Sequence, residues 1–192
     1  MAREFELKFR ASARQMTAIL EDHAGFREIS METAYFDTPE NALSQRKWTL
    51  RQRRENGQSI CTLKTPAENG GREEFEVPCE DIQAAIPELC KLGAPAELEE
   101  LTRKGVQKVC GARFVRQAAT LALEDCTLEL ALDRGILQGG ARIQLLGEVE
   151  VELKEGSEDA AIAFARTLAE KYGLIQERFS KHYRALALTG RI

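Results

Sequence analysis

The sequence is dominated by short segments in which apolar and charged residues alternate. Residues 3–10 place Phe5, Leu7 and Phe9 on one side of an extended chain and charged residues on the other. Residues 127–133 and 148–154 follow the same pattern. Period-two alternation is typical of a β-strand with two different surroundings. The chain is therefore expected to form a sheet with one apolar face and one charged face.

The charged residues of these segments are grouped by sign. Residues 51–53 read Arg-x-Arg, whereas residues 74–76 and 148–152 carry carboxylates at every second position. Ordinary surfaces mix the two signs. Carboxylates two apart on one strand face lie about 7 Å apart and repel each other unless a cation lies among them. A solvated sheet face is the simplest alternative and needs no ligand, but the grouping by sign favours a charged interior.

The order of elements predicts an α+β fold in one domain that spans residues 1–192. We count eight or nine strands, among them 47–56 and 58–65 joined by the turn Asn56-Gly57. Helices are expected after a capping box at Ser12, over 80–103 with breaks at Pro87 and Pro95, from Ser157, and over 180–188. The sheet is expected to close into an eight-stranded antiparallel β-barrel, with a charged lumen and the helices coating the outside.

Composition excludes several classes of protein. The 27 basic and 31 acidic residues give a net charge of -4, which argues against a dedicated nucleic-acid binder. No apolar run approaches the ~20 residues of a membrane span, and the first residues lack the apolar centre of a signal peptide. Five scattered cysteines without a Cys-x-x-Cys motif predict reduced thiols and a cytoplasmic location. Two histidines exclude a multi-histidine metal site.

A lumen lined by both kinds of charge predicts a particular ligand. Carboxylate oxygens bind hard cations such as Mg²⁺ or Mn²⁺. Guanidinium and ammonium groups bind phosphate oxygens. Together they indicate a complex of a divalent metal with a polyphosphate anion.

Several motifs, in order along nearly the whole chain, resemble those of CYTH proteins, also called triphosphate tunnel metalloenzymes. The opening Glu4-x-Glu6-x-Lys8 resembles the ExExK signature of that family. The other matching segments are Tyr35-Phe36-Asp37-Thr38-Pro39, Leu50-Arg51-Gln52-Arg53, Leu63-Lys64-Thr65, Glu74-Phe75-Glu76, Glu129-x-x-x-Asp133-Arg134-Gly135, Glu148-x-Glu150-x-Glu152-x-Lys154 and Ser180-Lys181-His182-Tyr183-Arg184.

The resemblance implies an eight-stranded tunnel that holds a triphosphate and a divalent metal, and it implies roles for individual residues. The metal ligands implied by position are Glu4, Glu6, Asp133, Glu148, Glu150 and Glu152. The implied phosphate contacts are Lys8, Arg51, Arg53, Lys64 and Arg116, with Lys154, Lys181 and Arg184 as further ones. Glu6, Lys8 and Glu150 are assigned the catalytic role. The expected reaction is metal-dependent hydrolysis of inorganic triphosphate to diphosphate and phosphate.

Parity along the strands separates some neighbouring residues. Arg113 and Arg116 cannot both face inward on a regular strand, and Arg116 is chosen. Trp48 has the parity opposite to Arg51 and is expected to pack outside, which leaves no evident residue to stack on a base. His182 is expected to be structural.

Other readings of the same residues remain open. A class IV adenylate cyclase or a thiamine triphosphatase would use a similar tunnel, and Tyr35 or Phe36 offers an aromatic ring for either. A polyphosphate-binding module without activity is a further alternative. The expected partner is a small-molecule triphosphate, with neither nucleic acid nor membrane, and the chain is expected to be a monomer or a homodimer.

Overall fold

The computed structural model describes residues 5–67 and 71–191 and shows an α+β fold, as expected. All strands belong to one antiparallel sheet: β1 (Phe5–Arg10), β2 (Arg27–Asp37), β3 (Thr49–Glu55), β4 (Gln58–Pro66), β5 (Arg72–Pro78), β6 (Gln107–Ala122), β7 (Cys126–Gly139), β8 (Arg142–Gly156) and β9 (Ile175–Gln176). The helices are α1 (Ala13–Asp22), α2 (Ala42–Gln45), α3 (Ile82–Lys91), α4 (Glu97–Thr102), α5 (Glu158–Tyr172) and α6 (Lys181–Ala187).

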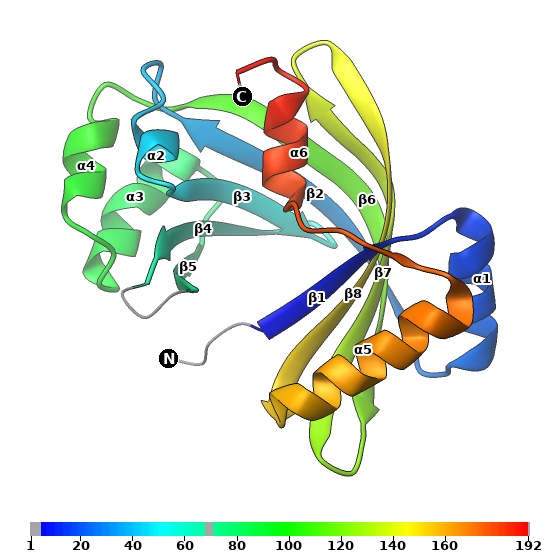
Figure 1. The fold of residues 1–192 in the computed structure, drawn as a ribbon. Helices are drawn as coiled ribbons and strands as arrows, with labels where there is room; N and C mark the ends of the chain where they lie inside the picture. The colour runs from blue at the N-terminus through cyan, green and yellow to red at the C-terminus, as the bar shows by residue number, and fades with distance from the viewer. Residues whose placement is uncertain (1–4, 68–70, 192) are drawn as a thin grey trace.

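The sheet curls around its charged face but does not close. Its strand order is β5-β4-β3-β2-β6-β7-β8-β1-β9, and no ladder joins β5 to β1 or β9 within the described residues (Figure 1). The expected eight-stranded closed barrel is therefore wrong for this structure. The free edge of β1 is already used in part, because Phe9 pairs with Gln176 and the amide of Glu177 donates to the carbonyl of Lys8.

Local sequence signals explain most element boundaries. The Ser12–Gln15 capping box is present at the start of α1, and Ser157 caps α5. The turn between β3 and β4 has positive φ at Asn56 and Gly57, which matches its Asn-Gly sequence. The sequence Asn69-Gly70-Gly71 predicts a further turn, but Asn69 and Gly70 lie outside the described residues.

Two expected boundaries are wrong, and one strand was not expected. The sequence pattern predicts two strands, at about 107–117 and 119–124, but the structure has the single strand β6, because pairing with β7 continues unbroken through Ala118 and Ala119. Helix α3 continues through Pro87, which does not end it. The two-residue strand β9 was not expected, because its pairing with β1 rather than any pattern of its own defines it.

Two groups of helices cover the apolar outer face of the sheet (Figure 1). Helices α1 and α5 pack on the outer face of β1, β7 and β8, where Met16, Ile19 and Leu168 are buried. Helices α2, α3 and α4 cover β3, β4 and β5. Trp48 lies in this second core, as its parity predicts. Burial of these faces leaves the charged residues on the concave side.

Helix α6 differs from the others because it packs on the concave face, against β6 and β7. The expectation that all helices coat the outside is therefore wrong for α6. Its apolar residues Ala185 and Leu186 are buried there with Phe114 and Leu137. Gly139 permits the approach, since a Cβ at this position would lie 2.2 Å from the carbonyl oxygen of Ala185. Helix α6 thus fills one part of the concave side and leaves a cavity beside it.

Candidate functional site

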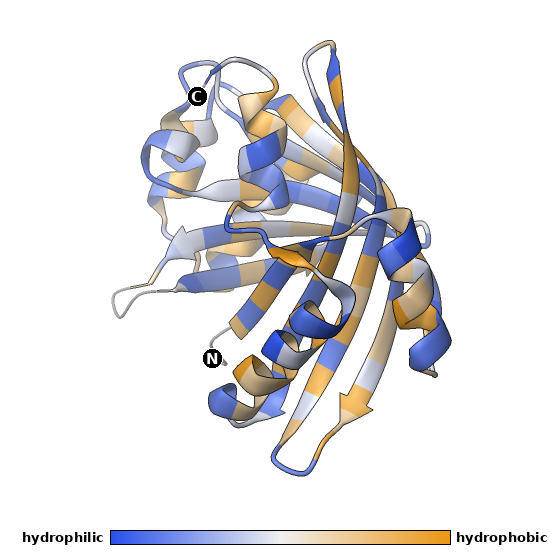
Figure 2. Cartoon of the chain, turned by 45° about the vertical axis from the view of Figure 1, so that its right-hand side comes forward, coloured by the Kyte–Doolittle hydropathy of each residue, from blue (hydrophilic) through white to orange (hydrophobic). Residues whose placement is uncertain are grey.

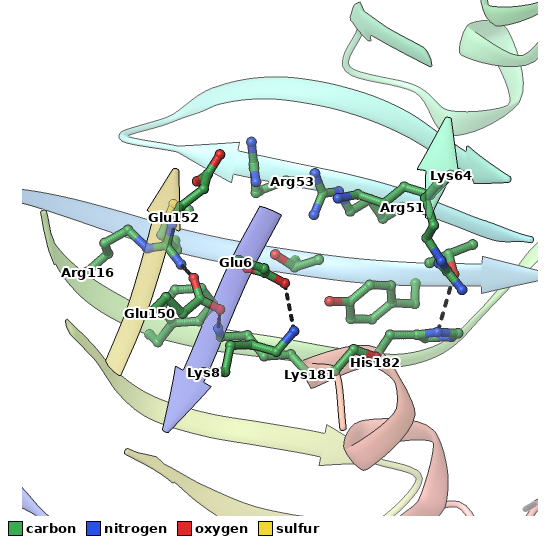
Figure 3. A pocket seen from close by; sticks show the side chains of 17 residues that line it. Glu6, Lys8, Arg51, Arg53, Lys64, Arg116, Glu150, Glu152, Lys181 and His182 are labelled. Atoms are coloured by element: carbon green, nitrogen blue, oxygen red, sulfur yellow. Dashed lines mark hydrogen bonds and ion pairs between the residues drawn. The ribbon is translucent and has the colours of Figure 1, made fainter. Parts of the chain in front are cut away.

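The concave face and the start of α6 enclose a cavity of ≈ 170 Å³ (Figure 3). Its lining is rich in charged side chains contributed by β1, β3, β4, β5, β6, β8 and α6. The lining residues are Glu6, Lys8, Met31, Thr33, Tyr35, Thr49, Arg51, Arg53, Lys64, Arg72, Phe114, Arg116, Glu150, Glu152, Ser180, Lys181 and His182. A cavity with this lining suits a compact ligand that carries many charges.

One wall of the cavity is basic and comes from β3, β4 and β5. Arg51 donates to Glu74 at 3.0 Å, and Lys64 lies 3.2 Å from the same carboxylate. Arg53 pairs with Glu55 at 2.7 Å. The Nε of Arg51 is nevertheless buried without a hydrogen-bond partner among the described residues, whereas the contact of Arg53 with Glu55 is made by its own Nε. Buried donors of this kind need an acceptor, so the basic wall can donate hydrogen bonds to a bound anion.

The opposite wall is formed by β1 and β8 and is mainly acidic. Their antiparallel register places Glu6 opposite Glu152 and Lys8 opposite Glu150. Lys8 donates to Glu6 at 2.6 Å, as drawn in Figure 3. Two facing carboxylates and an adjacent ammonium group provide oxygen ligands for a hard cation beside a contact for phosphate.

Behind this wall lies a buried cluster of three carboxylates, Asp133, Glu148 and Glu150, whose ligand atoms lie within 4.8 Å of one another. The α6 residue Lys181 contacts all of them, at 2.8 Å for Asp133 and 2.6 Å for Glu150, and it also pairs with Glu148. Arg116 binds Asp133 through two hydrogen bonds of 2.8 Å.

Two more contacts complete this cluster. Arg116 also pairs with Glu150, and Arg184 pairs with Glu148. The three acidic side chains are thus balanced by three basic ones. Such balance is required, because unpaired charges in a protein interior are very costly.

The surroundings of the cluster shift its pKa values in opposite directions. Burial raises the pKa of Glu148 to about 7, against the opposing effect of the Lys181 charge. Burial acts on Glu150 as well, but the charges of Lys181 and Arg116 outweigh it and hold its pKa below the ordinary value. Burial opposes the charged form of Lys181, yet the neighbouring carboxylates raise its pKa overall. The ammonium group of Lys181 is therefore a permanent positive charge in the cluster.

Two groups of carboxylates fit a divalent cation. The cluster of Asp133, Glu148 and Glu150 has three closely spaced oxygen donors, but Lys181 occupies its centre. Glu6 and Glu152 face each other at the cavity wall, next to Glu150. A cation bound by Glu6, Glu150 and Glu152 would reach the ligand directly, and the hard oxygen donors suit Mg²⁺ or Mn²⁺.

The structure brings most residues of the sequence-based site to the cavity. Nine of them line it, namely Glu6, Lys8, Arg51, Arg53, Lys64, Arg116, Glu150, Glu152 and Lys181. Asp133, Glu148 and Arg184 lie behind it in the buried cluster. Lys154 does not line the cavity and pairs with Glu152 at 2.8 Å. Glu4 lies outside the described residues.

Sequence reasoning did not assign several lining residues to the site. The ring of His182 lies 4.7 Å from that of Tyr35, and its Nδ1 lies 3.5 Å from Oγ1 of Thr49. Burial, with a smaller effect of Arg72, lowers the pKa of His182 to about 4. Tyr35 shares the parity of the inward residues of β2, which the alternation of residues 31–37 would have shown. His182 depends on the position of α6, for which the sequence carries no signal.

The fold and the cavity define an α+β protein whose curved antiparallel sheet surrounds a highly charged pocket. The model of the CYTH domain family matches residues 2–186, and the chain belongs to this family. An inorganic triphosphatase of Haemophilus influenzae is 27% identical over 180 residues. That match covers 88% of the chain and 50% of the relative, so the chain spans about half the length of this protein.

Solved structures share the fold. The PH1819 protein of Pyrococcus horikoshii superposes with a TM-score of 0.61 at 23% identity, covering 98% of this chain and 99% of the other. The Hippeastrum protein HpAC1, described as an adenylyl cyclase candidate with a dominant triphosphatase activity, has a TM-score of 0.63 at 18% identity. The superposition covers 100% of this chain and 97% of HpAC1. At these identities the likeness shows the fold alone.

Two further observations concern the whole chain. Among the described residues, no helix is both long enough and apolar enough to span a membrane. All five cysteines are free thiols, as their spacing predicts.

Proposed function

We propose that the protein hydrolyses a triphosphate with the help of a divalent metal ion, and that inorganic triphosphate is the preferred substrate. The observation that carries this proposal is the cavity with a basic wall on β3, β4 and β5 and an acidic wall on β1 and β8. Membership of the CYTH family and the distant relationship to an inorganic triphosphatase support it.

The basic residues would bind and orient the phosphate chain. The Nε of Arg51, which has no hydrogen-bond partner among the described residues, is available to a phosphate oxygen, and Arg53, Lys64, Arg116 and Lys8 add positive charge around the same space. Arginine suits this task because its planar group donates hydrogen bonds in fixed directions. Holding the anion in one orientation removes much of the entropic cost of reaching the transition state.

The acidic wall would hold the metal ion. Glu6, Glu150 and Glu152 are the ligands that the cavity geometry favours, and Glu4 is proposed to join them from the chain before β1. A bound Mg²⁺ or Mn²⁺ would neutralise charge that develops on the phosphate oxygens. Glu6, Glu150 and Lys8 would therefore act closest to the reacting phosphorus. The structure favours no single residue as the base that activates water.

The lining favours inorganic triphosphate over nucleotides. Trp48 is buried in the outer core, and the aromatic ring of Tyr35 is covered by His182. Few lining side chains can therefore stack on a base or a thiazole ring. Thiamine triphosphatase and adenylate cyclase are the alternative functions. A cyclase must also hold the 3′-hydroxyl of ATP in line with the α-phosphorus. Hippeastrum HpAC1, described as an adenylyl cyclase candidate, shares the fold.

A comparison of substrates tests this proposal. Phosphate release is measured with inorganic triphosphate, ATP, thiamine triphosphate and long-chain polyphosphate, each with Mg²⁺ and with Mn²⁺, and cyclic AMP is sought by chromatography. We expect kcat/KM for inorganic triphosphate to exceed that for ATP at least about a hundredfold, equal to ~2.7 kcal/mol. Formation of cyclic AMP that Glu6→Ala abolishes would replace hydrolysis by the cyclase reaction.

A further inference from the structure

Part of the outer face of the sheet is not covered by any helix. In Figure 1 the β7–β8 hairpin extends beyond α1 and α5, and its right-hand side carries no helix. Cross-strand pairing places Arg113, Ile136 and Leu145 side by side here, and Val115 beside Arg134 in the next row. This region is called the outer patch and consists of Val115, Arg134, Ile136, Ile143 and Leu145.

The outer patch exposes large apolar side chains together. The exposed fraction is 83% for Leu145, 61% for Ile143 and 40% for Val115. Figure 2 shows hydrophobic segments along these strands. Single exposed apolar residues are common, whereas a contiguous group of them marks an interaction surface. The outer patch therefore has the properties of a protein interaction surface.

A hollow of ≈ 750 Å³ adjoins these protruding side chains. It lies between α1 and the sheet, and Met16, Leu20, Leu132 and Leu145 contribute to its lining. The same face thus has an apolar ridge beside an apolar hollow. A surface with both shapes can pair with a copy of itself, because a twofold axis presents each ridge to the hollow of the other molecule.

The surface around the hollow also carries two residues of opposite charge, so it is complementary to a second copy of itself in charge as well as in shape. Arg134 and Glu28 both line it, and Arg134 is exposed and forms no ion pair with any described residue. Glu28 accepts a hydrogen bond from Gln117 and from no basic side chain in the described chain. In a twofold dimer each of these residues can face its opposite charge on the other copy, so the pair forms twice.

From these observations we propose that the outer patch and its hollow form a homodimer interface, in which Leu145 of one copy enters the hollow of the second copy and Glu28 faces Arg134 of the partner subunit. The interface lies on the outer face, whereas the cavity opens on the concave face. The proposal therefore does not depend on the reaction that the cavity supports.

The mass in solution tests the proposal. Sedimentation equilibrium of the full chain at micromolar concentrations is expected to show a species of twice 21.5 kDa. Leu145→Glu is expected to raise the dissociation constant at least about tenfold, because a buried apolar contact at the centre of an interface dominates its affinity. Leu92→Glu is the matched control, because Leu92 is 59% exposed, lies after α3 outside the patch, and is expected to leave the dimer intact.

A charge exchange tests the orientation of the two copies. Glu28→Arg and Arg134→Glu are each expected to weaken self-association, since like charges then face each other. An equimolar mixture of the two variants is expected to form a mixed dimer, in which every facing pair again has opposite signs. A wild-type chain that stays monomeric, a dimer that Leu145→Glu leaves intact, or a mixture that does not associate would each overturn the proposal.

Discussion

Arg53 and Arg54 are neighbours in β3 with opposite surroundings. Arg53 faces the cavity, where its Nε lies 2.7 Å from the carboxylate of Glu55. Arg54 points to the other face, where it pairs with Glu80 at 2.9 Å near solvent. Two identical side chains one residue apart therefore allow a direct comparison of an inward and an outward guanidinium.

We expect Arg53→Met to lower kcat/KM for inorganic triphosphate at least about tenfold, because a hydrogen bond to a charged group contributes about 1.5–3 kcal/mol. The free energy of unfolding without ligand should change little, since the variant removes only the partly exposed ion pair with Glu55, and such pairs contribute little. Arg54→Met is the matched control and should keep its activity. Steady-state kinetics and urea unfolding measure both effects. Equal losses in the two variants would remove Arg53 from the site.

His182 provides a pH-dependent contribution to stability. Burial lowers its pKa in the folded chain to about 4, from an ordinary value of 6.5. Because the folded-state pKa is depressed, the unfolded chain binds the proton first, and stability present above pH 6.5 is lost as the pH falls towards 4. The loss between pH 6.5 and pH 5 amounts to about 2 kcal/mol.

We therefore expect His182→Gln to lose less stability than the wild type over this pH range. Urea unfolding at both pH values gives the difference, and His23→Gln is the control because His23 is a partly exposed residue at the end of α1, outside the cavity. The same pH dependence in His182→Gln and the wild type would show that folding does not lower the pKa of His182.

Parity predicted single residues well wherever a strand is regular. It placed Arg116 in the cavity and Trp48 in the outer core, and it chose against Arg113, which pairs with Glu32 near solvent. It could not find His182, whose position depends on the docking of a helix. It also could not show that Lys154, which has inward parity, lies beyond the end of the cavity.

At the scale of elements, α6 is held by charge as well as by apolar contacts. Lys181 and Arg184 lie one turn apart on α6 and reach the same buried cluster. The ring of Phe114 lies 5.4 Å from Nζ of Lys181, which adds a cation–π contact. The sequence predicted a helix over residues 180–188 but not the face of the sheet that it covers. An apolar pattern could not show this, because two basic residues lie on the buried side of the helix.

We expect Lys181→Met to destabilise the ligand-free protein by about 3–5 kcal/mol, because it leaves buried carboxylates without a partner. The double variant Lys181→Met/Glu148→Gln should recover part of this loss. Mg²⁺ should raise the melting temperature of Lys181→Met more than that of the wild type, since the cluster then lacks its own cation. Thermal melts with and without Mg²⁺ measure these effects.

Lys171→Met is the control for this experiment. Lys171 pairs with Asp22 at 2.7 Å on the surface, where an ion pair contributes little. If Lys181→Met melts like Lys171→Met, the ion pairs of α6 do not hold the helix in place.

For the whole molecule, the open sheet is the main departure from expectation. Most of the strands followed from alternation and turns, but closure depends on whether β5 meets β1 across the cavity. Pairing of Phe9 and Arg10 with β9 occupies part of the edge that closure would need. A two-residue strand has no periodic pattern, so the sequence could not show this competition.

The two walls of the cavity also lie at the two ends of the sheet. Glu74 and Glu76 on β5 hold Arg51, at 3.0 Å and 3.6 Å, while Glu6 and Lys8 belong to β1. Under the proposed function a triphosphate with its metal would contact both walls, because its phosphate oxygens would bind Arg51 and Lys64 and the cation would bind Glu6. Ligand binding should therefore restrain the edge strands relative to each other.

We expect saturating triphosphate analogue with Mg²⁺ to slow backbone amide exchange in β5 and β1 at least about tenfold, equal to ~1.4 kcal/mol of local stability. The ligand binds only the folded chain, so the melting temperature should rise as well. Amides of α4 serve as an internal control, because this helix lies on the outer face and contributes no residue to the cavity lining. Hydrogen exchange read by mass spectrometry resolves these segments. Protection of β3 and β4 with unchanged exchange in β1 would mean that the ligand contacts only the basic wall, and the metal ligands assigned to β1 would then be wrong.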